Sequence, residues 1–323
     1  MIADISIIRN GFCDRLKLLT FYIVVAALRH EPVLYIKEEK SYAGPFLFLE
    51  FCRIEGLRAE PWNDQATGEA LKIDYGFEPG IKPSLGFVER NKPKDLSGVS
   101  GAAFLELWVS SYRRIVPIPE LARKIAAIGT GDDCLGLHIR MTDKIFPKVT
   151  DSVTPYAIAS AQVPRVNRVI ERGVRRFMAD NHGRAIYLAC DDGDWNASWQ
   201  RRLREMGYRV LSNDARYASD QFRQTSGEDF VTDLFSLAKC GGIIGTVDSG
   251  VPICAAYING SGRYAFAWSR MRFSRGLNYA RWQLHHRYHM NLFDLHHSAI
   301  IRQVLKLKLA RKLLDKVRPR KQR

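Results

Sequence analysis

The feature of the sequence that most constrains the fold is an alternation of short apolar runs and helical segments after residue 133. Strands are expected at residues 134–139, 185–190, 209–212 and 242–247. Helices are expected between them, within residues 155–181, at 195–206 and at 229–239. Strands joined by helices in this way form a parallel sheet. This half of the chain is therefore predicted to be a doubly wound α/β domain.

The first 128 residues show a weaker form of the same pattern. Residues 2–8 are apolar, residues 9–15 interrupt them with a glycine turn, and a helical pattern follows. A strand, a glycine turn and a helix open a Rossmann-like unit, and residues 32–36 supply a second strand. Loops with short strands are expected at residues 60–100, and helices at 103–115 and 117–128.

The length of 323 residues leaves room for two domains that each bury a core. A hydrophobic content of 46% with 26% charged residues is that of a globular protein. The sequence GTGDD at residues 129–133 is a natural linker. The predicted division is an N-terminal Rossmann-like domain at 1–128, a second Rossmann-like domain at 129–265, and a helical segment with a basic tail at 266–323.

Two sets of apolar residues are expected to be buried. The longest apolar run, residues 18–28, is too short to cross a bilayer and lacks a cleavage site, so it is predicted to be a buried helix. With no other targeting segment visible, the expected compartment is the cytoplasm. Several cysteines lie in strand-like apolar runs, such as residues 188–190 and 254–256. The widely spaced cysteines contain no CxxC pair and are predicted to be buried reduced thiols: Cys13, Cys52, Cys134, Cys190, Cys240 and Cys254.

The net charge of +15 is concentrated at the C-terminus. Residues 302–323 contain ten Lys or Arg and one acid, Asp315, and their apolar residues recur at helical spacing. A basic amphipathic helix of this kind either packs on the body with a solvated cationic face or contacts an anionic membrane. The second alternative would place residues 301–323 against the inner face of the membrane. A nucleic-acid partner is not expected, because no recognition motif accompanies the charge.

Polar side chains crowd the end of the strand at residues 134–139. Arg140 offers a planar donor fork suited to a phosphate, and His138 and Lys144 add donors at the same edge. Ligands of parallel sheets bind at the carboxyl ends of strands. Such cations can stabilise the negative charge of a departing nucleoside diphosphate. The alternative is a structural cluster of ion pairs.

The segment from His138 to Lys144 (HIRMTDK) resembles the first signature motif of the α1,6-fucosyltransferases, which include the nodulation fucosyltransferase type, and of their GDP-fucose-using relatives. The resemblance implies that Arg140 grips the β-phosphate of the donor and that His138 lies against the nucleotide. The family's usual second arginine is Met141 here.

Two further segments resemble the same family. The sequence YLACDD at residues 187–192 is similar to the family's YLATDD strand end. Asp233 precedes Ser249 by sixteen residues, the family's spacing between an aspartate that contacts the nucleotide and a serine that contacts phosphate. The backbone N–H groups after Ser249 would also face a phosphate. The turn from Asn10 to Arg15 resembles the family's opening loop, which implies donor contacts for both residues, with Cys13 in place of its second glycine.

The resemblance implies a GT-B-type fold, two Rossmann-like domains facing a cleft. It also implies an inverting transfer of a sugar, fucose by analogy, from a GDP-sugar to a glycan or lipid-linked oligosaccharide, without a metal or a cofactor. An inverting enzyme usually needs a carboxylate base. The family's glutamate lies four residues after the motif's lysine, where this chain has Lys148, so the nearest acidic candidate is Asp151. The predicted catalytic residues are Arg140 and Asp151.

Other hypotheses remain open at this stage. Asp192 and Asp194 fit the Asp-x-Asp pattern that holds a divalent ion, but also an ordinary strand-to-helix turn with an N-cap. The histidines between residues 285 and 297 could suggest a metal, although they lack partners at ligand spacing. A non-catalytic GDP-sugar-binding protein and a basic membrane- or nucleic-acid-binding scaffold are the alternative functions.

Overall fold

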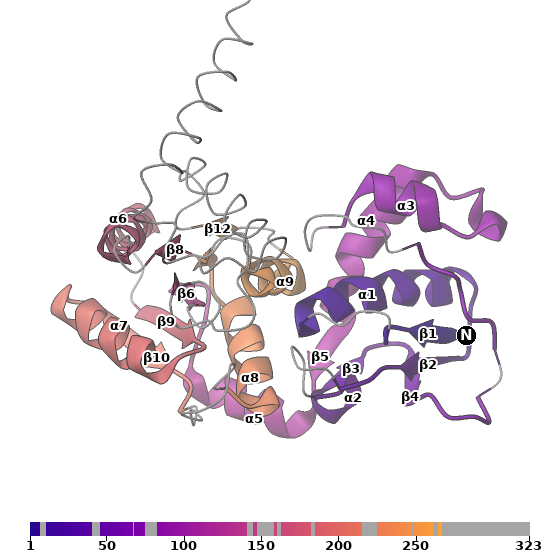
Figure 1. Ribbon diagram of the computed structural model, residues 1–323, viewed down its shortest axis with the longest axis horizontal. Helices are drawn as coiled ribbons and strands as arrows, with labels where there is room; N and C mark the ends of the chain where they lie inside the picture. Colours follow the sequence, from indigo (N-terminus) through magenta and orange to yellow (C-terminus); the bar gives the residue numbers. More distant parts are fainter. Residues whose placement is uncertain are drawn as a thin grey trace, which may run out of the picture.

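Two parallel β-sheets organise the protein in its computed structural model (Figure 1). The structure describes residues 1–6, 11–40, 46–66, 68–74, 83–140, 145–146, 158–159, 163–181, 185–214, 225–246, 249–260 and 264–266.

The larger sheet has five strands in the order β10-β9-β6-β11-β12, and all neighbours are parallel. Its strands are β6 (Cys134–Ile139), β9 (Ala185–Cys190), β10 (Arg209–Ser212), β11 (Gly242–Gly245) and β12 (Tyr264–Phe266). The chain runs outward from β6 to β10 and then returns to β11 on the other side of β6. The strand order therefore reverses between β6 and β11, which is the topological switch point of a doubly wound sheet.

Helices cover both faces of this sheet. On one face lie α6 (Val163–Asn181) and α7 (Gly193–Glu205); on the other lie α8 (Gly227–Ala238) and α9 (Gly250–Asn259) (Figure 1). Every residue of β6 and β9 is buried, as expected for strands covered on both sides.

The smaller sheet has the order β1-β2-β4 and is also parallel. Its strands are β1 (Ile2–Asp4), β2 (Val33–Lys37) and β4 (Arg58–Pro61). The connecting helix α1 (Phe12–Leu28) is buried along nearly its whole length, as predicted for residues 18–28. Short elements complete this half: α2 (Phe48–Phe51), β3 (Cys52–Ile54), α3 (Leu85–Asn91), η1 (Lys94–Leu96), α4 (Gly101–Ser111), η2 (Tyr112–Arg114), β5 (Ile115–Pro117) and α5 (Pro119–Ile128). Strands β7 (Ile145–Phe146) and β8 (Ile158–Ala159) form a separate parallel pair.

The two halves contact each other through α8 and α9, which pack against α1, α2 and α5 (Figure 1). Phe230 of α8 lies edge-on to Phe12 and tilted against Phe46, with ring centroids 5.7 and 5.8 Å apart. Gly227 packs so closely that a Cβ there would lie 2.6 Å from the Cγ of Phe46. The contact between the halves is therefore close-packed and largely aromatic.

The predicted fold class, an α/β chain with two Rossmann-like units, is confirmed. The bounds of β6, β9 and β10 agree with the prediction, and all six cysteines are buried free thiols. No helix in the described ranges combines the length and the apolar character that crossing a bilayer requires. The domain boundaries after residues 128 and 265 remain predictions, and the basic segment at 301–323 lies outside the described residues.

Several predicted elements were wrong. Residues 254–256, predicted to be strand-like, belong to helix α9. The helices predicted at 103–115 and 117–128 are confirmed as α4 and α5, but η2 and strand β5 take the place of their facing ends. The mostly irregular stretch predicted at 60–100 contains helix α3. Strand β1 ends at Asp4 instead of continuing toward residue 8, and β11 ends at Gly245 instead of residue 247.

Candidate functional site

The candidate site is a pocket at the carboxyl edge of the larger sheet, where β9, β6 and β11 end side by side. This edge includes the switch point, the usual place for a ligand of an open parallel sheet. Among the described residues, the lining consists of His138, Arg140, Cys190, Asp191, Thr225, Phe230, Asp233 and Val251. The pocket encloses ≈ 50 Å³, so it can bury only part of a nucleotide, and the remainder would extend beyond it.

Thr246 joins the two strand ends that carry the pocket. Its hydroxyl oxygen accepts a 2.8 Å hydrogen bond from the backbone N–H of Arg140, and its own N–H donates to the carbonyl of His138 at 3.0 Å. Thr246 is fully buried. These bonds hold the backbone of Arg140 where β6 leaves the sheet, so the first residue after the strand is fixed in place.

Asp233 brings a carboxyl group from α8 to the pocket. It is buried, and the hydroxyl of Tyr187 on β9 donates a 2.6 Å hydrogen bond to its Oδ1. Burial raises the pKa of Asp233 to about 7, although the bond from Tyr187 opposes the rise. Burial also raises the pKa of Tyr187, which therefore remains a donor. At neutral pH, Asp233 can exist with or without its proton, and a ligand that donates hydrogen bonds would favour the carboxylate.

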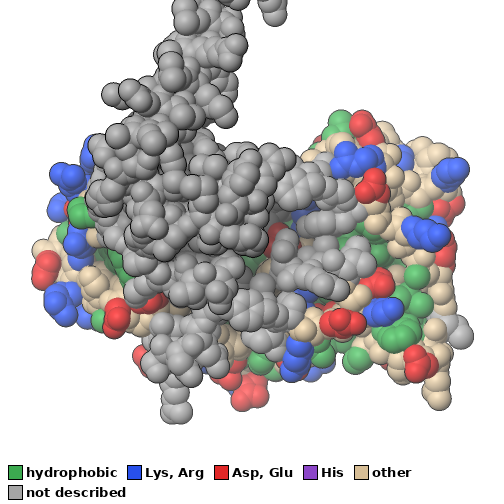
Figure 2. All heavy atoms as spheres, viewed as in Figure 1, with side chains coloured by type: hydrophobic (Ala, Val, Ile, Leu, Met, Phe, Trp, Pro, Cys, Tyr) green, Lys and Arg blue, Asp and Glu red, His purple; other side chains and the backbone are tan. Residues whose placement is uncertain are grey.

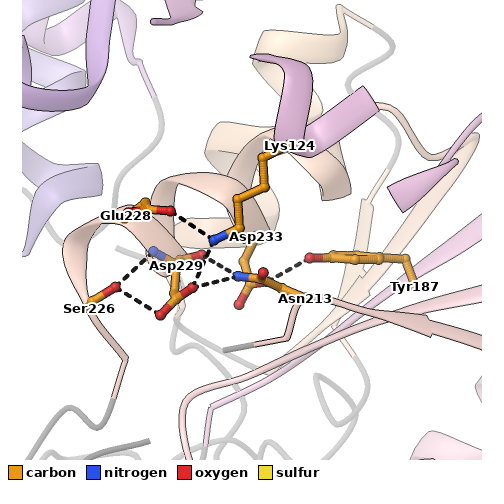
Figure 3. Close-up of polar contacts among 7 residues, drawn as sticks. All are labelled: Lys124, Tyr187, Asn213, Ser226, Glu228, Asp229 and Asp233. Atoms are coloured by element: carbon orange, nitrogen blue, oxygen red, sulfur yellow. Dashed lines mark hydrogen bonds and ion pairs between the residues drawn. The ribbon is translucent and has the colours of Figure 1, made fainter. Parts of the chain in front are cut away.

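A polar cluster fixes the first turn of α8, one turn before Asp233 (Figure 3). Asp229 accepts a bond from the amide of Asn213 at 3.0 Å and pairs with Lys124 at 3.3 Å. Lys124 also pairs with Glu228 at 2.9 Å, and the Ser226 hydroxyl caps the helix by accepting the N–H of Asp229. The cluster ties α8 to α5 and to the end of β10. It holds the helix that presents Asp233, without itself lining the pocket.

Phe230 connects the pocket with the other half of the protein. Its ring lines the pocket and also packs against Phe12 and Phe46 of the N-terminal half. One wall of the pocket therefore belongs to the contact between the halves.

Ser249 lies at the edge of this site. It is the N-cap residue of α9 and is completely buried, and its hydroxyl has no hydrogen-bond partner in the described structure. Its side chain is not among the described lining residues, but Val251, two positions later, is. A buried hydroxyl without a partner is costly, and it would be satisfied by an acceptor such as a phosphate oxygen.

The predicted site residues thus fall into three groups. His138 and Arg140 from the first motif and Asp233 from a separate one line one pocket, and Ser249 begins the helix beside it. Arg15 lies elsewhere: its buried guanidinium pairs with Glu38 at 3.1 Å and donates to the carbonyl of Phe46 at 2.8 Å. The remaining predicted residues, Asn10, Lys144 and Asp151, lie outside the described residues.

The structure favours the capping alternative for Asp192. Its side chain accepts the N–H of Trp195 at 3.0 Å and caps α7. Within the described residues, no group of three or more His, Cys, Asp or Glu side chains is arranged to hold a metal ion. The histidines between residues 285 and 297 lie outside the described residues.

A larger open groove of ≈ 900 Å³ lies along α7 and the end of β10. Its walls include Gln200, Arg201 and Arg204 on the helix and Asn213 after the strand. Among the described residues, none of the predicted donor-binding positions lines this groove, so the smaller pocket remains the candidate site.

The sequence analysis assigned no role to three residues that shape the site: Tyr187, Phe230 and Thr246. The role of Tyr187 could have been suspected from the sequence, because a hydroxyl in an otherwise apolar buried strand needs a hydrogen-bond partner. No sequence pattern indicates the roles of Phe230 and Thr246, because these depend on contacts with Phe12 and Arg140, each more than a hundred positions away.

No family model matches the sequence, and no curated protein matches it. Similar solved structures include POFUT1 in complex with GDP-fucose, at 10% identity and a TM-score of 0.32 over 49% of each chain. They also include an Arabidopsis thaliana FUT1 mutant in complex with GDP, at 12% identity and a TM-score of 0.43, covering 80% of this chain and 68% of that one. The match to POFUT1 spans about half the length of that protein. At these scores the similarity adds nothing about substrate or chemistry, which are inferred below from the residues of the pocket.

Proposed function

We propose that this protein is an inverting glycosyltransferase that moves a sugar, fucose by family resemblance, from a GDP-sugar to a glycan or lipid-linked oligosaccharide. One observation carries the proposal. His138 and Arg140 of one motif and Asp233 of another, some ninety residues later, line a single pocket at the ligand-binding edge of a parallel sheet.

Arg140 would act on the leaving group. The acceptor oxygen attacks the anomeric carbon, the bond from that carbon to the diphosphate oxygen breaks, and its electron pair leaves with GDP. The guanidinium of Arg140 would stabilise this developing charge through a bidentate contact with phosphate. The acceptor's proton passes to a carboxylate base, for which Asp151 remains the candidate.

Asp233 would select the nucleotide base. Tyr187 already donates to one of its oxygens, so the carboxylate is held in a fixed orientation. Guanine presents adjacent N–H donors on its Watson–Crick edge, which a carboxylate can accept as a pair, whereas adenine does not. This chemistry supports a GDP-sugar over an ADP-sugar.

The test is the shift in melting temperature of the protein with GDP, UDP, ADP and CMP, with and without EDTA. We expect a shift selective for GDP that EDTA does not change. Replacing Arg140 by Ala should weaken GDP binding by roughly 10- to 100-fold, the usual loss for a charge-assisted hydrogen bond. Arg123→Ala, an exposed arginine of α5, is the matched control and should bind GDP normally.

The same experiment separates the alternatives. Equal binding of all four nucleotides, or unchanged GDP binding by Arg140→Ala, would contradict the proposal. Loss of the GDP shift on chelation would favour the metal role of Asp192 and Asp194. A GDP shift without transfer or hydrolysis of GDP-fucose would favour a non-catalytic GDP-sugar-binding protein.

A further inference from the structure

The outer layer of the larger sheet carries an unusual arrangement of arginines. Helices α6 and α7 cover the face of the sheet that points away from the N-terminal half (Figure 1). Helix α6 turns Ile170, Val174 and Met178 into the core. Its opposite side exposes Arg168, Arg172, Arg175 and Arg176.

Helix α7 extends this cationic surface. Arg201 and Arg204 are exposed on it, and Arg202 pairs with Glu171 of α6, which joins the two helices side by side. In Figure 2, Lys and Arg side chains lie along the edge of the molecule over α6 and α7, with acidic side chains between them. We call the exposed residues Arg168, Arg172, Arg175, Arg176, Arg201 and Arg204 the α6/α7 cationic face.

In the described part of the chain, most of these arginines lack a carboxylate partner, which several cations of the N-terminal half have. In the N-terminal half, Arg15, Arg29 and Lys40 each pair with a carboxylate. By contrast, within the described residues, Arg168, Arg172, Arg175 and Arg201 form no ion pair with a carboxylate. Unpaired like charges on neighbouring helix turns repel each other, which raises the free energy of the surface. Binding of an external polyanion would offset this repulsion.

We propose that the α6/α7 cationic face docks on a bilayer that contains anionic phospholipids. The two adjacent helices spread their arginines over an extended surface, as docking on a membrane requires. Guanidinium groups also pair readily with lipid phosphates. Single-stranded nucleic acid is less suited, because such sites stack bases on exposed aromatic rings. No described residue of α6 or α7 exposes an aromatic side chain.

The test is co-sedimentation of the full chain with vesicles of equal parts phosphatidylglycerol and phosphatidylcholine, compared with vesicles of phosphatidylcholine alone. The variant Arg168→Gln/Arg172→Gln/Arg175→Gln removes three charges from the face with little change in helix propensity. We expect it to bind anionic vesicles about 100-fold more weakly than the unchanged chain, with the difference shrinking at high salt.

The matched control removes three exposed cations from the N-terminal half, as Arg53→Gln/Lys94→Gln/Arg123→Gln. Both variants have the same net charge and the same basic segment at residues 302–323, so neither total charge nor that segment can produce a difference between them. Arg201→Gln/Arg204→Gln, on α7, is a second variant in case the first does not fold, and it should also weaken binding.

Three outcomes would overturn the proposal. The first is equal vesicle binding by the face variants and the control variant. The second is no preference of the unchanged chain for anionic vesicles. The third is that the face variants bind a single-stranded RNA oligonucleotide more weakly but bind vesicles normally. This result would assign the surface to nucleic-acid binding.

Discussion

At the scale of single residues, Asp233 is the group whose protonation should be visible in solution. Its carboxyl is buried against Tyr187, and its pKa is raised to about 7. In the unfolded chain an aspartate titrates near ~4. Between these values the folded state holds a proton that the unfolded state has lost. The contribution of Asp233 to the free energy of unfolding should therefore be largest at low pH and be lost as the pH rises through about 7.

We expect Asp233→Asn to remove this part of the pH dependence, because the amide mimics the protonated acid. The free energy of unfolding that the unchanged protein loses between pH 5 and pH 8 should be on the order of 3 kcal/mol. Urea unfolding of both proteins at a series of pH values from 5 to 8 would measure it. Parallel pH profiles for the two proteins would show that Asp233 does not hold a proton in the fold.

At the scale of elements, the ends of β6 and β11 should depend on Thr246. Thr246→Val keeps the side-chain shape but removes the oxygen that accepts the N–H of Arg140. A buried N–H without a partner costs about 1–3 kcal/mol, so both stability and GDP binding should fall. Thr246→Ser retains the oxygen and should preserve GDP binding. Normal GDP binding by the valine variant would mean that the bond does not position Arg140.

How far the elements could be predicted depended on the kind of burial. Strands β6 and β9 are continuous apolar runs bounded by polar turns, so their ends were readable from the sequence. Helix α9 is just as apolar and is buried over most of its length, so it shows no amphipathic period and was read as strand-like. Strand β5 forms by pairing with β3, some sixty residues earlier, and no local sequence pattern predicts that pairing.

The candidate site likewise has residues that a local pattern predicts and residues whose contacts depend on distant parts of the chain. Residues directly after strands, such as Arg140, could be predicted because a parallel sheet brings strand ends together. Asp233 was found only by its spacing from Ser249. Arg15 follows the first turn as predicted, but the local motif did not indicate that its guanidinium would bind Glu38 and the carbonyl of Phe46. Contacts of this kind depend on tertiary packing.

At the scale of the whole molecule, the contact between the halves should be sensitive to one added methyl group. In Gly227→Ala, the new Cβ would lie 2.6 Å from the Cγ of Phe46 and 2.8 Å from the Cε2 of Phe51. Overpacking of this kind costs about 1–3 kcal/mol, which should outweigh the better helix propensity of alanine. Thermal or urea unfolding would measure the loss.

Gly98→Ala is the matched control for this variant, because a Cβ at Gly98 meets nothing within 4 Å. It should leave stability nearly unchanged. Equal stability of the two alanine variants would mean that the halves separate easily enough to accommodate the methyl group.

Helix α8 serves two neighbours at once: its Asp233 and Phe230 face the pocket, while Gly227 and the same phenylalanine ring meet the N-terminal half. These two contacts constrain any change in the ligand that the pocket binds. A mutation that reshapes the helix for a different ligand also disturbs its fit to Phe46, so it is tolerated only if the aromatic surface of the N-terminal half changes with it. Homologous proteins that bind a different ligand should therefore carry paired substitutions, one on helix α8 and one on the aromatic surface of the N-terminal half that packs against it.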